Sequence, residues 1–246
     1  MDGDQARPHG EQSRQRHIPL DEVTELLDLD FIQLATRIPV ILLALTVHEC
    51  AHGYFAYRMG DPTAYRQGRL TLNPLPHLDL LGTICLLIAP IGWAKPVPIN
   101  PLNFHDRRKG ILVSTAAGPA SNLVQAFLFA LLLRGLIFLS ENAGLTDGHA
   151  AAGLLKAATL MAVMAVLINV GLAVFNLLPL FPLDGFHITL QLLPADKQQR
   201  FAEMAPVGPF AILAVVFGSS LLGIDLIGRL IFPPVNFLLH HVAGLG

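Results

Sequence analysis

Long apolar stretches separated by polar segments run along the chain and predict membrane-spanning helices. A helix needs roughly 20 apolar residues to cross the hydrocarbon core of a bilayer. Three stretches meet this length and a fourth nearly does: Phe31–Met59, Ile111–Leu139, Ala157–Leu178 and Pro206–Ile224. Leu226–Val242 is also apolar, but charged, proline and histidine residues interrupt it. It either continues the fourth span, lies at the membrane interface or forms a further span.

The segments outside these spans predict other kinds of structure. Leu80–Trp93 is apolar but short and broken by proline and glycine, which is typical of a re-entrant segment. Thr63–Asn73 is predicted to form a β-strand or hairpin, and the proline-rich Lys95–Asn103 cannot be helical. Polar residues 1–28 predict an N-terminal tail before a membrane domain over residues 29–246. The predicted fold is an all-α polytopic membrane protein, a bundle of about 4–6 transmembrane helices with a re-entrant segment and a small β-hairpin.

The composition agrees with this membrane fold. The 246 residues are 53% hydrophobic and 14% charged, whereas soluble domains carry about 25% charged residues. The net charge of −2 argues against a nucleic-acid partner, which requires a basic surface. The predicted surroundings of the chain are therefore the lipid bilayer.

Basic residues predict how the spans are oriented. Arg107, Arg108 and Lys109 immediately precede the second span, which places its start on the cytoplasmic side. The loop at 140–156 contains a single lysine and is predicted to be external. The third span then returns inward, and arginines also follow the first span. The C-terminal ends of the first and third spans are thus expected on the same, cytoplasmic side.

A metal-binding motif lies near the end of the first span. Residues 48–52 read H-E-x-x-H, with His48, Glu49 and His52. Residues four apart lie one turn apart on one helix face, so both imidazoles can bind one zinc ion. Glu49 is then placed to take a proton from the zinc-bound water and pass it to the leaving amine. The alternative is a pair of helix-face histidines beside a surface glutamate. Ionisable groups within a span cost roughly 2.5–3.5 kcal/mol each, so three at one turn favour a compensating metal.

Asp184 is the candidate third ligand. A catalytic zinc usually has three protein ligands and an open position. Asp184 directly follows the third span on the expected side, where Pro179 and Pro182 end the helix. Irregular backbone at membrane depth is tolerated where it lines a wet cavity. The alternative is a turn residue, because Asp-Gly is a common turn pair. The nearby zinc motif favours the ligand, and one Zn²⁺ per chain is predicted.

Three motifs in order along the chain resemble the site-2 protease family of intramembrane zinc metalloproteases, peptidase family M50. They are H-E-x-x-H at 48–52, G-P-x-x-N at 118–122 and N-x-x-P-x-x-x-x-D-G at 176–185. The stretch 69–77 is similar to the short subgroup in bacteria and archaea, which lacks PDZ and CBS domains. The resemblance runs from Phe31 to Ile188.

The resemblance implies roles for individual residues. His48, His52 and Asp184 match the zinc ligands, and Glu49 matches the catalytic base. Asn122 and Asn176 match asparagines that bind the unwound substrate. Their alternative role is hydrogen bonding between helices, and the two roles can coexist. The predicted hairpin at 63–73 either pairs with an extended substrate near the active site by strand addition or is purely structural.

The expected function is intramembrane hydrolysis of peptide bonds in transmembrane protein substrates, as in regulated intramembrane proteolysis. The expected location is the plasma membrane of a prokaryote, with the active site near the cytoplasmic side. Control is expected from the lipid or from a regulatory membrane protein partner. One alternative is a zinc-binding membrane protein without protease activity, such as a chaperone-like relic, but the intact Glu49 argues against it. A metal transporter is the other, but the ligands cluster at one level without an internal repeat.

Overall fold

The computed structural model of the chain describes residues 31–82, 92–142, 150–218 and 225–245, with side chains from residue 36 onward. Helices make up most of this part of the chain. The predicted N-terminal tail, residues 1–28, lies outside the described residues.

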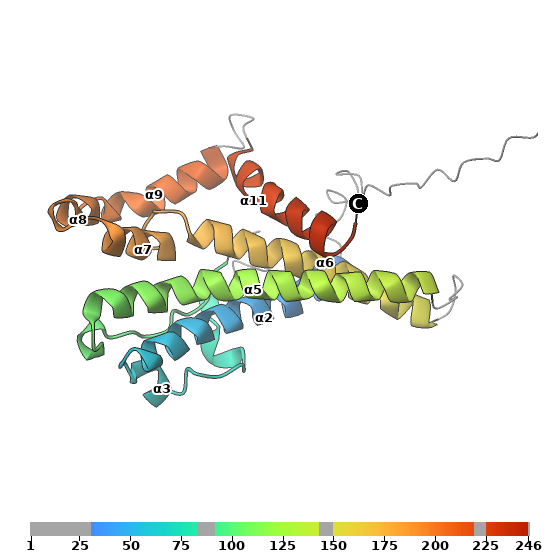
Figure 1. The fold of residues 1–246 in the computed structure, drawn as a ribbon, viewed down its shortest axis with the longest axis horizontal. Helices are drawn as coiled ribbons and strands as arrows, with labels where there is room; N and C mark the ends of the chain where they lie inside the picture. Colours follow the sequence, from blue (N-terminus) through green and yellow to red (C-terminus); the bar gives the residue numbers. More distant parts are fainter. Residues whose placement is uncertain (1–30, 83–91, 143–149, 219–224, 246) are drawn as a thin grey trace, which may run out of the picture.

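Three long helices form the body of the protein: α2 (Phe31–Arg58), α5 (Arg107–Asn142) and α6 (Ala150–Asn176). They lie side by side, and α5 runs in the direction opposite to α2 and α6 (Figure 1). Each is long and apolar enough to cross a membrane, with α2 qualifying from Thr36 onward. They correspond to the first three predicted spans, which are confirmed as helices of spanning length.

Small side chains allow α5 and α6 to pack closely. Alanines of both helices are fully or almost fully buried where they meet, which lets the two backbones approach closely. The C-terminal helix α11 (Leu226–Phe237) continues as a π-helical turn (Leu238–Val242) and packs against the same cluster. The buried members of this core are Ala126, Ala130, Leu133, Ala162, Val166, Val170, Val235 and Ala243.

Short helices connect α6 to α11 at one end of the bundle (Figure 1). They are α7 (Asp184–Leu192), α8 (Ala195–Ala202), a 3₁₀ turn (Ala205–Val207), α9 (Gly208–Leu213) and a π turn (Ala214–Gly218). The predicted fourth span, 206–224, is described only as far as Gly218. The segment Ala205–Gly218 is bent by 40° relative to α8. The two segments together have the length and apolarity of a span. The described residues therefore contain three candidate spans, or four if the bent pair is one.

The predicted hairpin at 63–73 is wrong. The segment begins with a short helix, α3 (Thr63–Arg66), and continues through turns. The carboxylate of Asp61 accepts hydrogen bonds from the backbone N–H and the hydroxyl of Thr63, which fixes a helical turn. Gly68 then adopts a positive φ of 67°, a conformation open to glycine that breaks any strand. Local side-chain bonds to the backbone therefore override the β-like pattern.

Extended chain is found instead at residues 92–100, here called the extended segment. Ala94 forms an antiparallel bridge with Leu78, and the N–H of Lys95 donates to the carbonyl oxygen of His77 over 2.8 Å. Prolines at alternate positions keep this segment out of the helical conformation. Of the predicted re-entrant segment 80–93, residues 83–91 lie outside the described residues.

A buried carboxylate ties the extended segment to the end of α2. One oxygen of Asp61 accepts from the backbone N–H of Asn100 over 2.7 Å, and the other accepts from the side-chain amide of Asn103 over 2.7 Å. Burial raises the pKa of Asp61, but the hydrogen bonds from Asn103, Thr63 and Asn100 outweigh burial and lower it below 3.8. This anchor holds the extended segment beside the helix that carries the H-E-x-x-H motif.

Candidate metal centre

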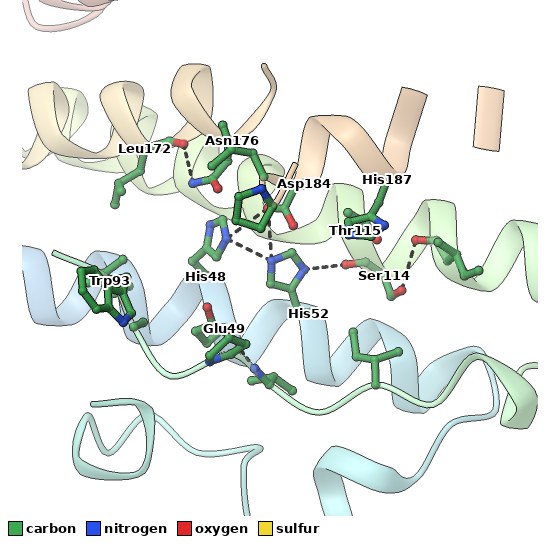
Figure 2. Close-up of a pocket in the computed structure, with 18 of the residues that line it drawn as sticks. His48, Glu49, His52, Trp93, Ser114, Thr115, Leu172, Asn176, Asp184 and His187 are labelled. Atoms are coloured by element: carbon green, nitrogen blue, oxygen red, sulfur yellow. Dashed lines mark hydrogen bonds and ion pairs between the residues drawn. The ribbon is translucent and has the colours of Figure 1, made fainter. Parts of the chain in front are cut away.

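The two motif histidines lie one turn apart on α2 and point into the space between α2, α5 and α7 (Figure 2). His48 and His52 are 5% and 8% exposed. Their Nε2 atoms are 3.0 Å apart. Two nitrogen ligands therefore face one point inside the protein.

Asp184 reaches the same point from another element. It is the first residue of α7, and its Oδ2 lies 3.3 Å from Nε2 of His48 and 3.3 Å from Nε2 of His52. The following Gly185 allows this approach, because a Cβ there would lie 2.3 Å from the carbonyl oxygen of Leu177. The Asp-Gly pair thus opens a helix and does not form the turn that the sequence left as an alternative. The C-terminal ends of the first and third spans meet at one end of the bundle, as predicted.

The spacing of these three atoms fits a tetrahedral metal ion. Zinc binds nitrogen and oxygen ligands at about 2.0–2.1 Å, so two ligand atoms of a tetrahedral site lie roughly 3.3 Å apart. The three observed separations are 3.0, 3.3 and 3.3 Å. Two imidazoles and a carboxylate are also a donor set that catalytic zinc accepts.

The hydrogen-bond partners of the two Nδ1 atoms leave both Nε2 atoms available to bind a cation. Nδ1 of His52 lies 2.8 Å from the carbonyl oxygen of Ser114, which can only accept, so this nitrogen carries the proton. Nδ1 of His48 lies 2.5 Å from Oδ1 of Asn122. When both imidazoles are neutral and carry their proton on Nδ1, their Nε2 lone pairs face Oδ2 of Asp184, which has no hydrogen-bond partner among the described residues. Three lone pairs converging at this distance repel one another unless a cation lies between them.

The glycine of the G-P-x-x-N motif faces the same site from α5. A Cβ at Gly118 would lie 2.3 Å from Nε2 of His52 and 2.7 Å from Cε1 of His48. The backbone of α5 therefore touches the edges of both imidazoles. Gly118 therefore serves the close packing of α5 against the two imidazoles.

Glu49 lies beside the two histidines and is held by the extended segment. Its Oε2 accepts a hydrogen bond from the backbone N–H of Val97 over 2.9 Å. In Figure 2 this carboxylate lies between α2 and the extended segment, on the side of the histidines away from Asp184. The backbone of residue 97 thus fixes the orientation of the predicted base, a role that the side-chain pattern of the sequence did not signal.

A cavity of about 680 Å³ brings these groups together. Its walls come from α2, the extended segment, α5, the end of α6 and α7. Glu49, Asp184, Asn176 and His187 are among its polar lining residues. Burial lowers the pKa of His187, and the nearby carboxylate of Asp184 opposes this shift. The cavity can therefore hold water and polar backbone next to the predicted ligands.

The two predicted substrate-binding asparagines differ in position. Asn176 lines the cavity, and its Nδ2 donates to the carbonyl oxygen of Leu172 over 2.9 Å. Its role in substrate binding stays a prediction. Asn122 is fully buried and outside the cavity lining, and its Nδ2 donates to Oδ1 of Asn169 on α6. For Asn122 the contacts are those of the alternative role, hydrogen bonding between helices.

Asn169 is a site residue that the sequence reasoning missed. It is fully buried on α6 and connects to His48 through Asn122. One signal was available, because it is a side-chain amide inside an uncharged span. It also lies seven residues before Asn176, about two helical turns away on the same face.

Comparisons with known proteins identify the family of the chain. The model of peptidase family M50 matches residues 134–216. The Bacillus subtilis protein named "Putative zinc metalloprotease YwhC" is 40% identical over 184 residues, which cover 74% of this chain and 79% of that protein. The chain belongs to peptidase family M50. The family predicted from the three motifs is thereby confirmed.

More distant relatives carry the same description. Rip2 of Mycolicibacterium smegmatis is 33% identical over 181 residues, which cover 71% of this chain and 62% of that protein. Rip2 of Mycobacterium tuberculosis is 30% identical over 177 residues, which cover 70% and 61%. No solved structure matches the chain. The M50 family, these relatives and the candidate spans support the coarse prediction of an integral-membrane zinc metalloprotease.

Proposed function

We propose that this member of family M50 is an intramembrane zinc metalloprotease that hydrolyses peptide bonds of transmembrane protein substrates. The observation that carries the proposal is the convergence of Nε2 of His48, Nε2 of His52 and Oδ2 of Asp184 within 3.3 Å of one another. The predicted base, Glu49, lines the same cavity. Ligands without a base would suit a passive metal site, whereas this pairing suits hydrolysis.

The chain's own groups divide the chemistry between them. His48, His52 and Asp184 would hold the zinc ion. When bound, the ion would supply Lewis acidity that polarises the scissile carbonyl and acidifies water. The carboxylate of Glu49 removes a proton from the attacking water as its oxygen bonds to the carbonyl carbon. The same proton then passes to the amine nitrogen as the C–N bond breaks.

The cavity suits a substrate that has been drawn out of its helical conformation. A transmembrane helix pairs its own N–H and C=O groups, so the bond to be cut must first be unwound. The freed backbone groups then need polar partners, and the amide of Asn176 in the cavity lining offers both a donor and an acceptor. Apolar lining residues such as Leu45, Val97 and Phe175 provide surfaces for apolar side chains.

The proposed location is the plasma membrane of a prokaryote, with the site near the cytoplasmic face. The basic residues Arg58, Arg107, Arg108 and Lys109 lie at the end of the bundle that carries the site, and basic residues favour the cytoplasmic side. A regulatory membrane protein that controls substrate access is part of the same proposal.

Replacing Glu49 by alanine tests the proposal. The purified protein, reconstituted in lipid vesicles with a model single-span substrate, is expected to cleave at least about 10²-fold more slowly when the base is lost. Zinc content should remain one ion per chain, because the ligands are untouched. Glu141→Ala, an exposed glutamate at the far end of α5, is the matched control. Equal cleavage by wild type and Glu49→Ala would overturn the proposal, and zinc binding with no cleavage by wild type would favour the zinc-binding alternative.

A further inference from the structure

Two fully buried asparagines stand behind His48 on the side away from the cavity. Asn122 on α5 and Asn169 on α6 are both 0% exposed. Oδ1 of Asn122 lies 2.5 Å from Nδ1 of His48, and Nδ2 of Asn122 lies 2.9 Å from Oδ1 of Asn169. A line of hydrogen bonds therefore crosses all three long helices and ends on a predicted zinc ligand.

The direction of this line follows from its far end. A side-chain amide can be rotated to exchange its oxygen and nitrogen, so its hydrogen-bond partners must decide its orientation. Asn169 lies 2.9 Å from the carbonyl oxygen of Ala165, which can only accept, so Nδ2 of Asn169 faces that oxygen. Oδ1 of Asn169 then faces Asn122 and requires a donor there.

The same constraint passes on to His48. Nδ2 of Asn122 faces Oδ1 of Asn169 and also lies 3.3 Å from the carbonyl oxygen of Ala44. Its two N–H groups meet two acceptors, so Oδ1 of Asn122 must face the imidazole. That oxygen accepts, so Nδ1 of His48 must carry the proton. Nε2 of His48 is then left with the lone pair that a metal ion needs.

We propose that Asn122 and Asn169 are positioning residues that fix the metal-binding tautomer of His48. The inference rests on the proposed function in one respect, namely that His48 binds zinc. The two histidines are oriented by different hydrogen-bond partners. His52 is oriented by a backbone carbonyl, that of Ser114, which no substitution removes. His48 depends on two side chains, so its orientation is the one that mutation can disturb.

A purely structural role makes a different prediction. Hydrogen bonds between helices would stabilise the bundle whatever the tautomer of His48, and their loss would lower stability without a selective effect on zinc. The proposed hydrogen-bond relay from Asn169 through Asn122 to His48 instead acts on zinc affinity through a single atom, Nδ1 of His48. Removing Asn122 therefore abolishes whatever Asn169 contributes, and the two substitutions are expected to be non-additive.

The test measures zinc affinity of the full-length protein in detergent by competition with a chromophoric chelator, with thermal unfolding of the zinc-free protein in parallel. Asn122→Leu is expected to bind zinc roughly 10–100-fold more weakly, the usual effect of losing a hydrogen-bond partner of a ligand. Asn169→Leu is expected to show a smaller loss, because the carbonyl of Ala44 still orients Asn122. The double variant should bind no more weakly than Asn122→Leu alone.

Two further variants separate tautomer control from packing. Asn122→Asp keeps the shape of the side chain and an oxygen facing Nδ1, so it should bind zinc more tightly than Asn122→Leu. Gln125→Leu removes another buried amide from α5, one whose nitrogen and oxygen have no hydrogen-bond partner among the described residues, and should leave zinc affinity unchanged. If Asn122→Leu fails to fold, Asn169→Leu and Asn122→Asp still carry the test.

The outcomes separate the two proposals. Wild type that binds no zinc would defeat the proposed function together with the relay. Wild type that binds zinc, with Asn122→Leu binding equally well, would overturn the relay alone. Additive losses in the double variant would also overturn it, since the relay requires both residues to act through one atom.

Discussion

Adding a single methyl group at Gly118 is expected to disable the metal site while the bundle stays folded. Gly118 lies on α5 against the edges of both imidazoles. The change Gly118→Ala introduces no charge and favours helix formation by roughly 1 kcal/mol, because alanine has the higher helix propensity. Any loss of function must therefore come from the contact with the histidines.

The size of the effect follows from the distances. The new Cβ would lie 2.3 Å from Nε2 of His52, whereas ordinary contacts of a Cβ begin near 3.4 Å. Either the ring or the helix must therefore move by about 1 Å. The ring is held from behind by the carbonyl of Ser114, and α5 is packed against α6. Functional geometry tolerates roughly 0.5 Å, and a misplacement of about 1 Å can reduce the rate about 10²-fold.

The assay compares Gly118→Ala with Gly135→Ala in the same helix. A Cβ at Gly135 meets nothing within 4 Å, so this control carries the same chemical change without the contact. Zinc content, cleavage of the model substrate in vesicles and thermal unfolding are measured for both. Gly118→Ala should lose zinc affinity and at least about 10²-fold in cleavage rate, whereas Gly135→Ala should match wild type in both.

The reasoning would be refuted if Gly118→Ala cleaved and bound zinc like Gly135→Ala. That result would mean that α5 does not contact the imidazoles closely enough to define the site.

Two further predictions concern the extended segment. Val97→Pro removes the N–H that donates a hydrogen bond to Glu49. Hydrogen bonds to charged groups contribute about 1.5–3 kcal/mol. The value of kcat/KM should therefore fall roughly 10–100-fold. Val97→Ala keeps the N–H and controls for packing, and equal rates in both variants would contradict the role of the N–H. The pKa of Asp61 is lower in the folded protein than its unfolded value of 3.8, so the ionised carboxylate stabilises the fold. This stabilisation is fully present above the unfolded pKa and is lost as the pH falls through the folded pKa. Asp61→Asn should therefore reduce the decline in thermal stability below that pH, and an unchanged decline would argue against the anchor.

The sequence was sufficient to predict the parts of the fold that depend on apolar length and on helical spacing. The three long helices follow from uninterrupted apolar stretches, whose extent decides whether they can span a bilayer. The meeting of His48, His52 and Asp184 followed from one helical turn and from the inferred orientation of the spans. These are properties that a side-chain pattern encodes directly.

The rest depended on contacts that a side-chain pattern does not encode. The hairpin at 63–73 was wrong because the carboxylate of Asp61 captures the backbone at Thr63, a contact between polar groups that a β-like pattern ignores. The roles of the Ser114 carbonyl and the Val97 N–H are carried by backbone atoms, which every residue type supplies. Asn169 could be placed behind His48 only once the packing of α5 on α6 was known.

The central claim is that one metal ion binds at the point where two imidazoles and a carboxylate converge. Zinc K-edge X-ray absorption on the purified protein, together with its Asp184→Ala variant, tests it most directly. The account predicts one zinc per wild-type chain, bound to two imidazole nitrogens and to oxygen at about 2.0–2.1 Å, with much weaker binding in the variant. Zinc bound through sulfur, or binding that is unchanged in Asp184→Ala, would contradict it.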